Sequence, residues 1–177
     1  SSLYYAFNLI VSGSESSGEI GTRSLPSEYL PLDYISSESS FGSFNGANGG
    51  AYIKLDFPLA TTDRVQTKVV FAVTDNDNNG AVFCMRKSTT DPSYTLFRLG
   101  ANMRFDYNMT QEPSKTSVAK DTPYEIDVHD GKVFVNGGAE PFITNEQEPF
   151  DVSGTALGLF ASNADNTFSN FSKMRMY

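Results

Sequence analysis

The sequence contains no tryptophan, one cysteine and one histidine among its 177 residues. The single cysteine, Cys84, cannot form a disulfide within the chain, and its apolar neighbours favour a buried and unreactive thiol. The single histidine, His129, excludes zinc sites that need two or three histidines, and the cysteine count excludes four-cysteine sites. The chain therefore has few of the residues on which metal-dependent or nucleophilic catalysis relies.

Positive charge is also scarce, because 13 Lys and Arg stand against 21 Asp and Glu and give a net charge of −8. The basic residues are scattered singly, whereas binding to nucleic acid needs clustered cations, so we expect no nucleic-acid partner. No apolar run reaches the roughly 18 residues of a membrane-spanning helix, so we expect no membrane insertion. The chain begins at Ser1 without a signal peptide, and we expect it to be a processed piece of a larger protein.

The hydrophobic pattern predicts an all-β fold. Segments rich in β-branched and aromatic residues alternate with Gly, Asn, Asp, Ser and Pro, and no segment of ten or more residues keeps a helical apolar spacing. We predict strands at 68–73, 81–86, 94–99, 103–108, 124–129, 132–137, 156–162 and 171–177. Eight short strands at regular spacing indicate a sandwich or a barrel, in one domain spanning residues 1–177.

Two short sequences predict turns between these strands. Asp130-Gly131 in HDGK predicts a two-residue hairpin turn, because both positions tolerate a positive φ. The sequence LGAN at 99–102 predicts a similar connection. Residues before position 50 are rich in small polar side chains, and the segment 3–11 is the one strand that we predict among them.

The stretch TDNDNNGAVF resembles the start of a calcium-binding loop, because Asp75, Asp77 and Asn79 alternate before Gly80. The twelfth position of such a loop should be Glu but is Arg86, and both flanks are predicted strands. We therefore predict a bare turn in which Asn79-Gly80 adopts positive φ, with no metal ligands and no cofactor. A structural calcium ion held by loop oxygens is left open as the alternative.

The order of several segments resembles a known family. LPSEYLPLDYI followed by AYIKLDF, then YEIDVHDGKVFVNG, and finally LFASN with FSKMRMY are together similar to laminin-G-like, concanavalin A-like modules of gut-bacterial surface proteins and phage tail proteins. The resemblance covers residues 25–177 and implies a jelly-roll β-sandwich of two antiparallel sheets. Residues 1–24 have no counterpart and form either an added strand or a connector. Most such modules bind glycans or mediate adhesion without catalysis, and some members of the fold are glycoside hydrolases.

The stretch EIDVHD is similar to the catalytic motif E-I-D-x-x-E of laminarinase-type hydrolases of this fold. Alternation places Glu125 and Asp127 on one face of the strand, as that motif requires. The third position is Asp130, which belongs to the predicted hairpin turn, and His129 continues the face instead. We interpret the stretch as a strand that runs into a hairpin, and we expect no enzyme.

Sugar binding needs hydrogen-bonding groups around an apolar platform, which tyrosine has to supply in the absence of tryptophan. Arginine forks suit either a carboxylate or a pair of sugar hydroxyls, and loops at strand ends often bind ligands. On these grounds we predict ligand contacts from Arg86, Tyr94, Arg98, Asp106, Asn108 and Asn163. A structural Arg–Asp pair is the alternative interpretation of the arginines.

The resemblance thus favours a noncatalytic carbohydrate-binding or adhesion module. It would belong to a larger extracellular, cell-surface or virion protein, with a glycan or surface polysaccharide and the neighbouring modules as its partners. The net charge of −8 disfavours strongly anionic glycans. The alternative is a structural or partner-binding module of a phage tail or cell-surface assembly, and a glycoside hydrolase is the third hypothesis.

Overall fold

The computed structural model describes residues 35–36, 52–55, 59–74, 79–165, 167–170 and 172–177. Every regular element in these ranges is a strand, and none of them holds a helix long and apolar enough to cross a membrane. The prediction of an all-β fold is therefore confirmed. The predicted strand at 3–11 lies outside the described residues.

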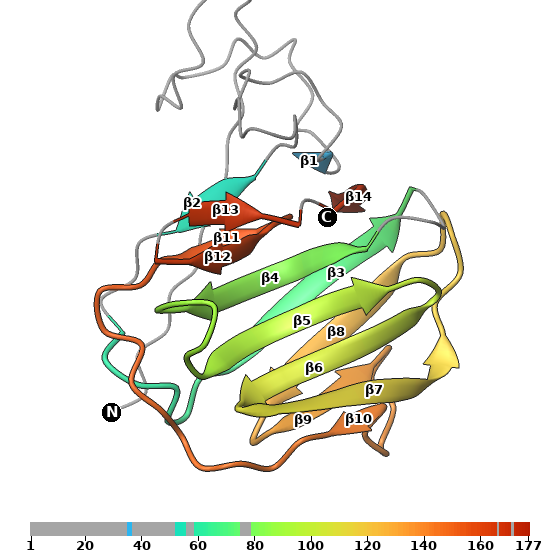
Figure 1. Cartoon of the computed structure of the whole chain (residues 1–177). Helices are drawn as coiled ribbons and strands as arrows, with labels where there is room; N and C mark the ends of the chain where they lie inside the picture. Colours follow the sequence, from blue (N-terminus) through green and yellow to red (C-terminus); the bar gives the residue numbers. More distant parts are fainter. Residues whose placement is uncertain (1–34, 37–51, 56–58, 75–78, 166, 171) are drawn as a thin grey trace, which may run out of the picture.

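Two six-stranded antiparallel sheets form the body of the domain (Figure 1). Sheet A has the order β1 (Ile35–Ser36), β14 (Met174–Met176), β3 (Thr67–Val73), β8 (Tyr124–His129), β9 (Lys132–Val135) and β10 (Ile143–Thr144). Sheet B has the order β2 (Ile53–Leu55), β11 (Leu157–Leu159), β4 (Gly80–Arg86), β5 (Ser93–Leu99), β6 (Asn102–Asn108) and β7 (Thr110–Ser117). The chain crosses repeatedly between the sheets, which makes the fold a jelly-roll β-sandwich.

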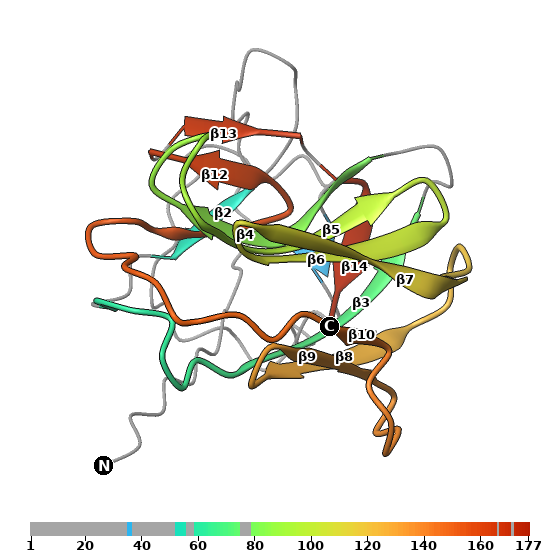
Figure 2. The same cartoon turned by 60° about the horizontal axis from the view of Figure 1, so that its bottom comes forward.

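A short hairpin, β12 (Ser162–Ala164) with β13 (Thr167–Ser169), adds a third layer. Figure 2 shows it above β4, on the side of sheet B that faces away from sheet A. The Cys84 thiol of β4 donates to the backbone oxygen of Asn163 in β12 at 3.4 Å. A Cβ at Gly158 of β11 would lie 2.7 Å from the ring of Phe168, so only glycine lets β13 approach β11 this closely.

The core lies between the two sheets and follows from strand alternation. In β6, Met103, Phe105 and Tyr107 are buried and face sheet A. Tyr94 of β5 packs against Phe105, with ring centroids 5.8 Å apart, and its hydroxyl donates to Thr67 Oγ1 of β3 at 2.8 Å. Aromatic packing and this hydrogen bond together tie sheet B to sheet A.

The predicted hairpin turn at Asp130-Gly131 is confirmed, with φ of 49° and 70°. The connection at 99–102 also forms a turn, with Gly100 at φ 61°. The predicted positive φ at Gly80 is wrong, because Gly80 is not among the glycines that have a positive φ. Gly80 instead begins β4, where a Cβ would lie 2.6 Å from the Cα of Ser172, so close backbone packing explains this glycine.

Three predicted strands are shorter than expected. The segment 132–137 ends at Val135, because Asn136 and Gly137 have φ of 52° and 67° and form a turn. The segment 156–162 is interrupted at Phe160, whose φ of 66° redirects the chain from β11 into the hairpin β12–β13. The segment 171–177 contains only the strand β14.

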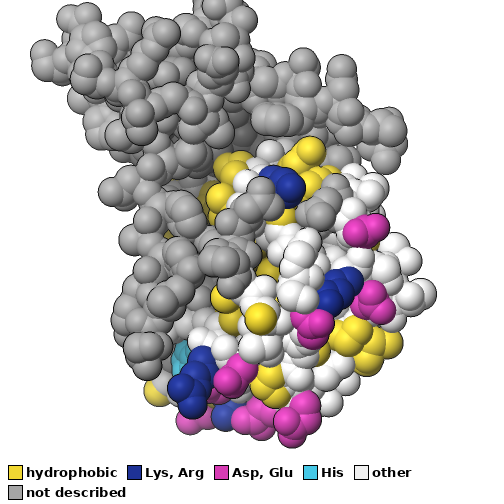
Figure 3. All heavy atoms as spheres, turned by 90° about the vertical axis from the view of Figure 1, so that its left-hand side faces the viewer, with side chains coloured by type: hydrophobic (Ala, Val, Ile, Leu, Met, Phe, Trp, Pro, Cys, Tyr) yellow, Lys and Arg dark blue, Asp and Glu magenta, His cyan; other side chains and the backbone are white. Residues whose placement is uncertain are grey.

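The surface alternates in charge on the side shown in Figure 3, where most Lys and Arg side chains lie next to Asp or Glu side chains. Among the described residues, Lys87 pairs with Asp151 at 2.6 Å and Lys132 pairs with Glu146 at 2.6 Å. These exposed pairs contribute little to stability, since solvent screens them.

Candidate functional site

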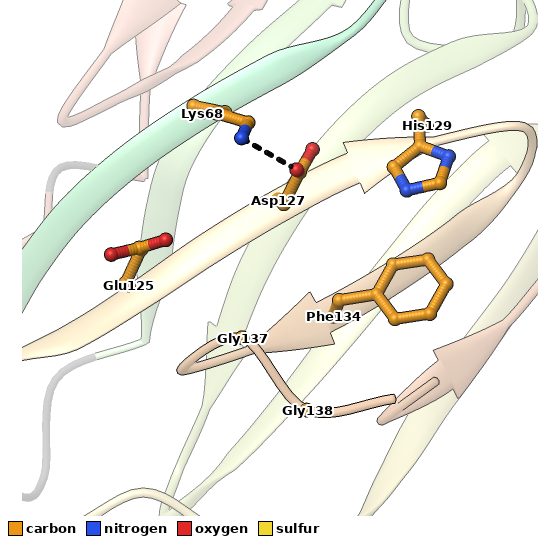
Figure 4. A pocket seen from close by; sticks show the side chains of 7 residues that line it. All are labelled: Lys68, Glu125, Asp127, His129, Phe134, Gly137 and Gly138. Carbon is orange, nitrogen blue, oxygen red and sulfur yellow. Dashed lines mark ion pairs between the residues drawn. The ribbon is translucent and has the colours of Figure 1, made fainter. Parts of the chain in front are cut away.

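A shallow hollow of about 350 Å³ lies on the outer face of sheet A, across β3, β8 and β9. Figure 4 shows the residues that line it, which are Lys68, Glu125, Asp127, His129, Phe134, Gly137 and Gly138. We call it the β8 hollow. Alternation along β8 explains the lining, because Ile126 and Val128 are buried in the core while the acidic residues and the histidine point outward.

Cross-strand register brings the other side chains to the hollow. Asp127 of β8 lies directly opposite Lys68 of β3 on one side and Phe134 of β9 on the other. Neighbours across an antiparallel ladder have Cβ atoms about 5 Å apart, close enough for direct contact. The hollow therefore combines an aromatic ring, an ammonium group and two carboxylates on three adjacent strands.

The Asp127 carboxylate is held in place from one side. Lys68 Nζ lies 3.1 Å from Asp127 Oδ2, and Gln66 Nε2 donates to both carboxylate oxygens at 2.9 and 3.1 Å. Glu125, one pleat along β8, is exposed, and its carboxylate makes no hydrogen bond or ion pair with the described residues. The Asp127 carboxylate is thus fixed by its neighbours, and the Glu125 carboxylate is free to accept hydrogen bonds from a ligand.

The aromatic wall of the hollow is a stacked pair. The rings of His129 and Phe134 have centroids 4.8 Å apart and an interplanar angle of 11°. His129 Nδ1 also lies 3.2 Å from Asp130 Oδ2 in the hairpin turn. This stacking fixes the direction of the Phe134 ring, which is half-buried and forms an apolar surface beside the carboxylates.

A second hollow of about 310 Å³ adjoins the first on the same face. It is lined by Arg64, Val65, Gln66, His129 and Asp130. His129 lines both hollows, and Gln66, which holds Asp127 in the first, lines the second. The two hollows together offer more length than a single sugar ring needs.

The hydrolase-like stretch EIDVHD places only two of its three acids in the β8 hollow. Glu125 and Asp127 line it, whereas Asp130 lies in the hairpin turn with its side chain 83% exposed. A retaining glycosidase needs a second carboxyl group about 5 Å from the first and free to act as nucleophile or acid. Here Asp127 is occupied by Lys68 and Gln66, which favours the interpretation of the stretch as a strand and hairpin.

A separate polar group lies on the outer face of sheet B, on β4 to β6. Arg104 binds Asp106 with both arms of its fork, Nε to Oδ1 at 2.7 Å and Nη2 to Oδ2 at 2.9 Å, and its Cζ lies 5.0 Å from the centroid of the Phe97 ring. Asp106 is only 6% exposed. Burial raises the pKa of this carboxyl group, and the hydrogen bonds and charge of Arg104 offset part of the rise.

Three of the six predicted ligand contacts lie together on this face. Arg86 and Asn108 are both opposite Ser93 of β5, and Asp106 is one pleat away on β6. Asn108 Nδ2 donates to the backbone oxygen of Glu148 at 2.9 Å. These three residues remain candidates for ligand binding, with Arg104 rather than Arg86 or Arg98 as the ion-pair partner of Asp106.

The other three predicted contacts have no surface to offer a ligand and are removed from the candidate site. Tyr94 and Arg98, 3% and 1% exposed, point into the sandwich because their ladder partners Tyr107 and Met103 face the core. Asn163 is fully buried beneath the hairpin β12–β13, where its amide nitrogen donates to the backbone oxygen of Ala156 at 2.6 Å. Tyr94 lies near the start of β5, as the predicted strand at 94–99 has it, but its side chain faces the core.

The sequence did not predict the β8 hollow as a binding site. Alternation did place Glu125, Asp127 and His129 on one face, and that signal was correct. Lys68 and Phe134 join them only through the pairing of β3, β8 and β9, and strand pairing cannot be read from the sequence pattern.

Among the described residues, no three His, Cys, Asp or Glu side chains gather as a metal site. Asp75 and Asp77 of the calcium-like stretch lie outside the described residues, and Asn79 Oδ1 accepts a hydrogen bond from Gly100 N at 2.6 Å.

Neither a family model nor a curated protein matches the sequence. Among solved structures, the CBM40 module of Ruminococcus gnavus IT-sialidase bound to α2,3-sialyllactose is similar, with a TM-score of 0.47 and 15% identity over 64% of this chain and 75% of that chain. The same module bound to α2,6-sialyllactose gives a TM-score of 0.48 at 15% identity, over 64% and 76%. A heptameric SAP-like pentraxin from Limulus polyphemus gives 0.46 at 13% identity, over 70% and 66%. Similarity at these identities concerns the sandwich alone.

Proposed function

We propose that this domain is a noncatalytic carbohydrate-binding module that holds a saccharide in the β8 hollow. The observation that supports this most is the stacked pair of Phe134 and His129 beside the carboxylates of Glu125 and Asp127. A pyranose has an apolar C–H face and a rim of hydroxyl groups, and it needs both kinds of surface close together. The exposed side of the Phe134 ring takes the apolar face, and the carboxylates take hydroxyl hydrogens.

The two carboxylates have different parts in this proposal. Asp127 is fixed by Lys68 and Gln66, so a hydroxyl that reaches it meets an acceptor that needs no reordering. Glu125 is free to accept from two adjacent hydroxyls, and hydrogen bonds to a charged acceptor are stronger than neutral ones. The hollow is shallow and open, so affinity for each site is weak, and useful binding comes from repeated copies in a larger protein.

The sequence resemblance to laminin-G-like modules supports the wider part of the proposal. The domain then belongs to a multimodular protein outside the cell, on a cell surface or on a virion, and its partners are a glycan and the neighbouring modules. A structural module that binds only protein partners is the second candidate. The resemblance includes such modules, and the polar, serine-rich sequence suits an exposed scaffold domain equally well.

Binding of neutral glycans tests the proposal directly. The wild-type chain and the variant F134A are applied to a broad glycan array, and every hit is measured by isothermal titration calorimetry. F97A is the matched control, because Phe97 is also a half-buried phenylalanine but lies on the outer face of sheet B. We expect F134A to lose neutral-glycan binding and F97A to keep it. A wild type that binds no neutral saccharide, or an F134A variant that binds as well as the wild type, contradicts the proposal.

A further inference from the structure

Arg86 ends β4 on the outer face of sheet B, on the opposite side of the sandwich from the β8 hollow. Its backbone oxygen accepts a hydrogen bond from Asp165 N, at 3.4 Å, which holds the end of β4 against the hairpin β12–β13. Its side chain lies beside Ser93 of β5, the residue opposite it in the ladder. The position of this guanidinium is therefore set by two neighbouring elements.

The guanidinium of Arg86 has a buried nitrogen for which the described residues provide no hydrogen-bond acceptor. Its Nε is buried and has no hydrogen-bond acceptor among the described residues, and it forms no ion pair with them. Arg104, on the same face, has a carboxylate on both arms of its fork. Arg86 is therefore the arginine on this face that no described carboxylate binds, and the terminal nitrogens of its half-buried side chain, rather than the buried Nε, are the atoms that a ligand can contact.

The local charge specifies what that ligand carries. Arg86 and Arg104 contribute two positive charges and Asp106 one negative charge, which leaves one net positive charge on a chain of net charge −8. Both oxygens of Asp106 are bound by Arg104, so Asp106 does not neutralise Arg86 at contact distance. One singly charged oxyanion complements this site, whereas a polyanion would be repelled by the rest of the molecule.

The surroundings of Arg86 are suited to the sugar that carries such a group. The Phe97 ring, under the Arg104 guanidinium, gives an apolar surface on the same face. Asn108, the last residue of β6, and the exposed Gln111, near the start of β7, have amide groups that can form hydrogen bonds with sugar hydroxyls. Asp106 is buried, so the site is partly shielded from water and its charges act strongly.

We propose that Arg86 is the centre of a second binding site, which takes one carboxylate or sulfate ester of an acidic saccharide. The guanidinium fork holds the oxyanion, and the sugar ring lies toward Phe97 and Asn108. The choice of a saccharide as the carrier rests on the proposed function of the domain, while the recognition of an oxyanion rests on Arg86 alone. This site differs from the β8 hollow in both its face and its charge.

The test is a titration of the whole chain with four probes. They are a galactan trimer that ends in one galacturonic acid, a galactan trimer that carries one sulfate ester, a neutral galactan trimer and inorganic sulfate. The variants are R86Q, which removes the charge, R86K, which keeps the charge but not the fork, and K120Q as the control. Lys120 is exposed and lines neither hollow, and K120Q changes the net charge by the same amount as R86Q. Circular dichroism melts confirm that each variant is folded.

We expect at least one acidic trimer to bind about tenfold more tightly than the neutral trimer and inorganic sulfate, with R86Q removing that difference. R86K should keep a smaller part of it, K120Q should keep all of it, and F134A should bind the acidic trimer as tightly as the wild type does. Equal affinities for the acidic trimer in R86Q and K120Q would overturn the site, and so would equal binding of the acidic and neutral trimers by the wild type. Inorganic sulfate that binds as tightly as the trimers would overturn the saccharide as carrier. Loss of acidic binding in F134A but not in R86Q would place that ligand in the β8 hollow. If the wild type binds no neutral glycan, by contrast, that result contradicts only the proposed site in the β8 hollow and leaves the Arg86 site unaffected.

Discussion

Asn145, just after β10, is expected to stabilise the sandwich through its side-chain amide, and Asn145→Asp tests this. The side chain is 1% exposed, and its nitrogen donates to the backbone oxygens of Phe105 in β6 and Thr110 in β7, both at 2.9 Å. Its own backbone nitrogen donates to Gly131 O, in the hairpin of sheet A, at 2.7 Å. One residue therefore connects an edge of sheet A to an edge of sheet B.

The magnitude follows from the two hydrogen bonds and the new charge. Two amide hydrogen bonds contribute about 2 kcal/mol net. Aspartate has no hydrogen to donate, and its carboxylate would face two carbonyl oxygens in a buried site. A rise of about two pKa units in such a site adds about 2.7 kcal/mol near neutral pH. We expect N145D to lower the free energy of unfolding by about 4 to 5 kcal/mol. This is a large share of the roughly 5–15 kcal/mol that is typical of a folded domain.

Urea denaturation followed by far-ultraviolet circular dichroism measures this loss, with N136D as the matched control. The side-chain oxygen of Asn136 accepts a hydrogen bond from Glu125 N at 2.9 Å, and aspartate keeps that acceptor. We expect N136D to stay within about 0.5 kcal/mol of the wild type. In N145D the folded-state pKa of the new carboxyl group is raised. The loss of unfolding free energy relative to the wild type should therefore shrink toward pH 4 and grow as the pH rises. Equal losses in N145D and N136D would refute the reasoning.

Three further predictions concern other parts of the molecule. Burial raises the pKa of Asp106 in the folded state. The contribution of Asp106 to folding stability is therefore present at low pH and is lost as the pH rises through that pKa. The stability of the wild type relative to D106N should therefore fall from about pH 4 upward in thermal melts, and a rise would mean that the Arg104 pair outweighs burial. Burial also raises the pKa of the Cys84 thiol, so a disulfide reagent should label the native protein at least about 100-fold more slowly than the urea-unfolded chain, and equal rates would contradict this. Thermal melts in EGTA and in calcium should have the same midpoint, and a higher midpoint in calcium would show a structural ion.

Much of the fold could be predicted because alternation is a local signal. The central strands β3, β4, β5, β6 and β8 begin within one residue of their predicted starts, and apolar residues dominate the inner face of each. β7 was missed because its sequence TQEPSKTS is polar and contains Pro113. An edge strand can hold a proline, since one side of its backbone needs no ladder partner, but that position is known only from the sheet order.

The candidate sites were harder to predict because they depend on which face is inward. Strand alternation puts Arg98 on the same face as Leu96, and in the structure that face is the core rather than a ligand surface. A local pattern also says nothing about cross-strand neighbours, which bring Lys68 and Phe134 to Asp127. The predicted positive φ at Gly80 failed for a similar reason, because the contact of Gly80 with Ser172 joins segments far apart in the sequence.

The kink at Phe160 determines how a long ligand has to run across sheet B. This buried residue keeps a positive φ, an unfavourable conformation for an aromatic residue, and so turns the chain back over β11 and β4. The hairpin β12–β13 then stands beside Arg86 as a wall, whereas β5 to β7 lie on its other side. A long ligand bound at Arg86 would therefore run away from the hairpin, across β5 and β6 toward the β7 edge of sheet B.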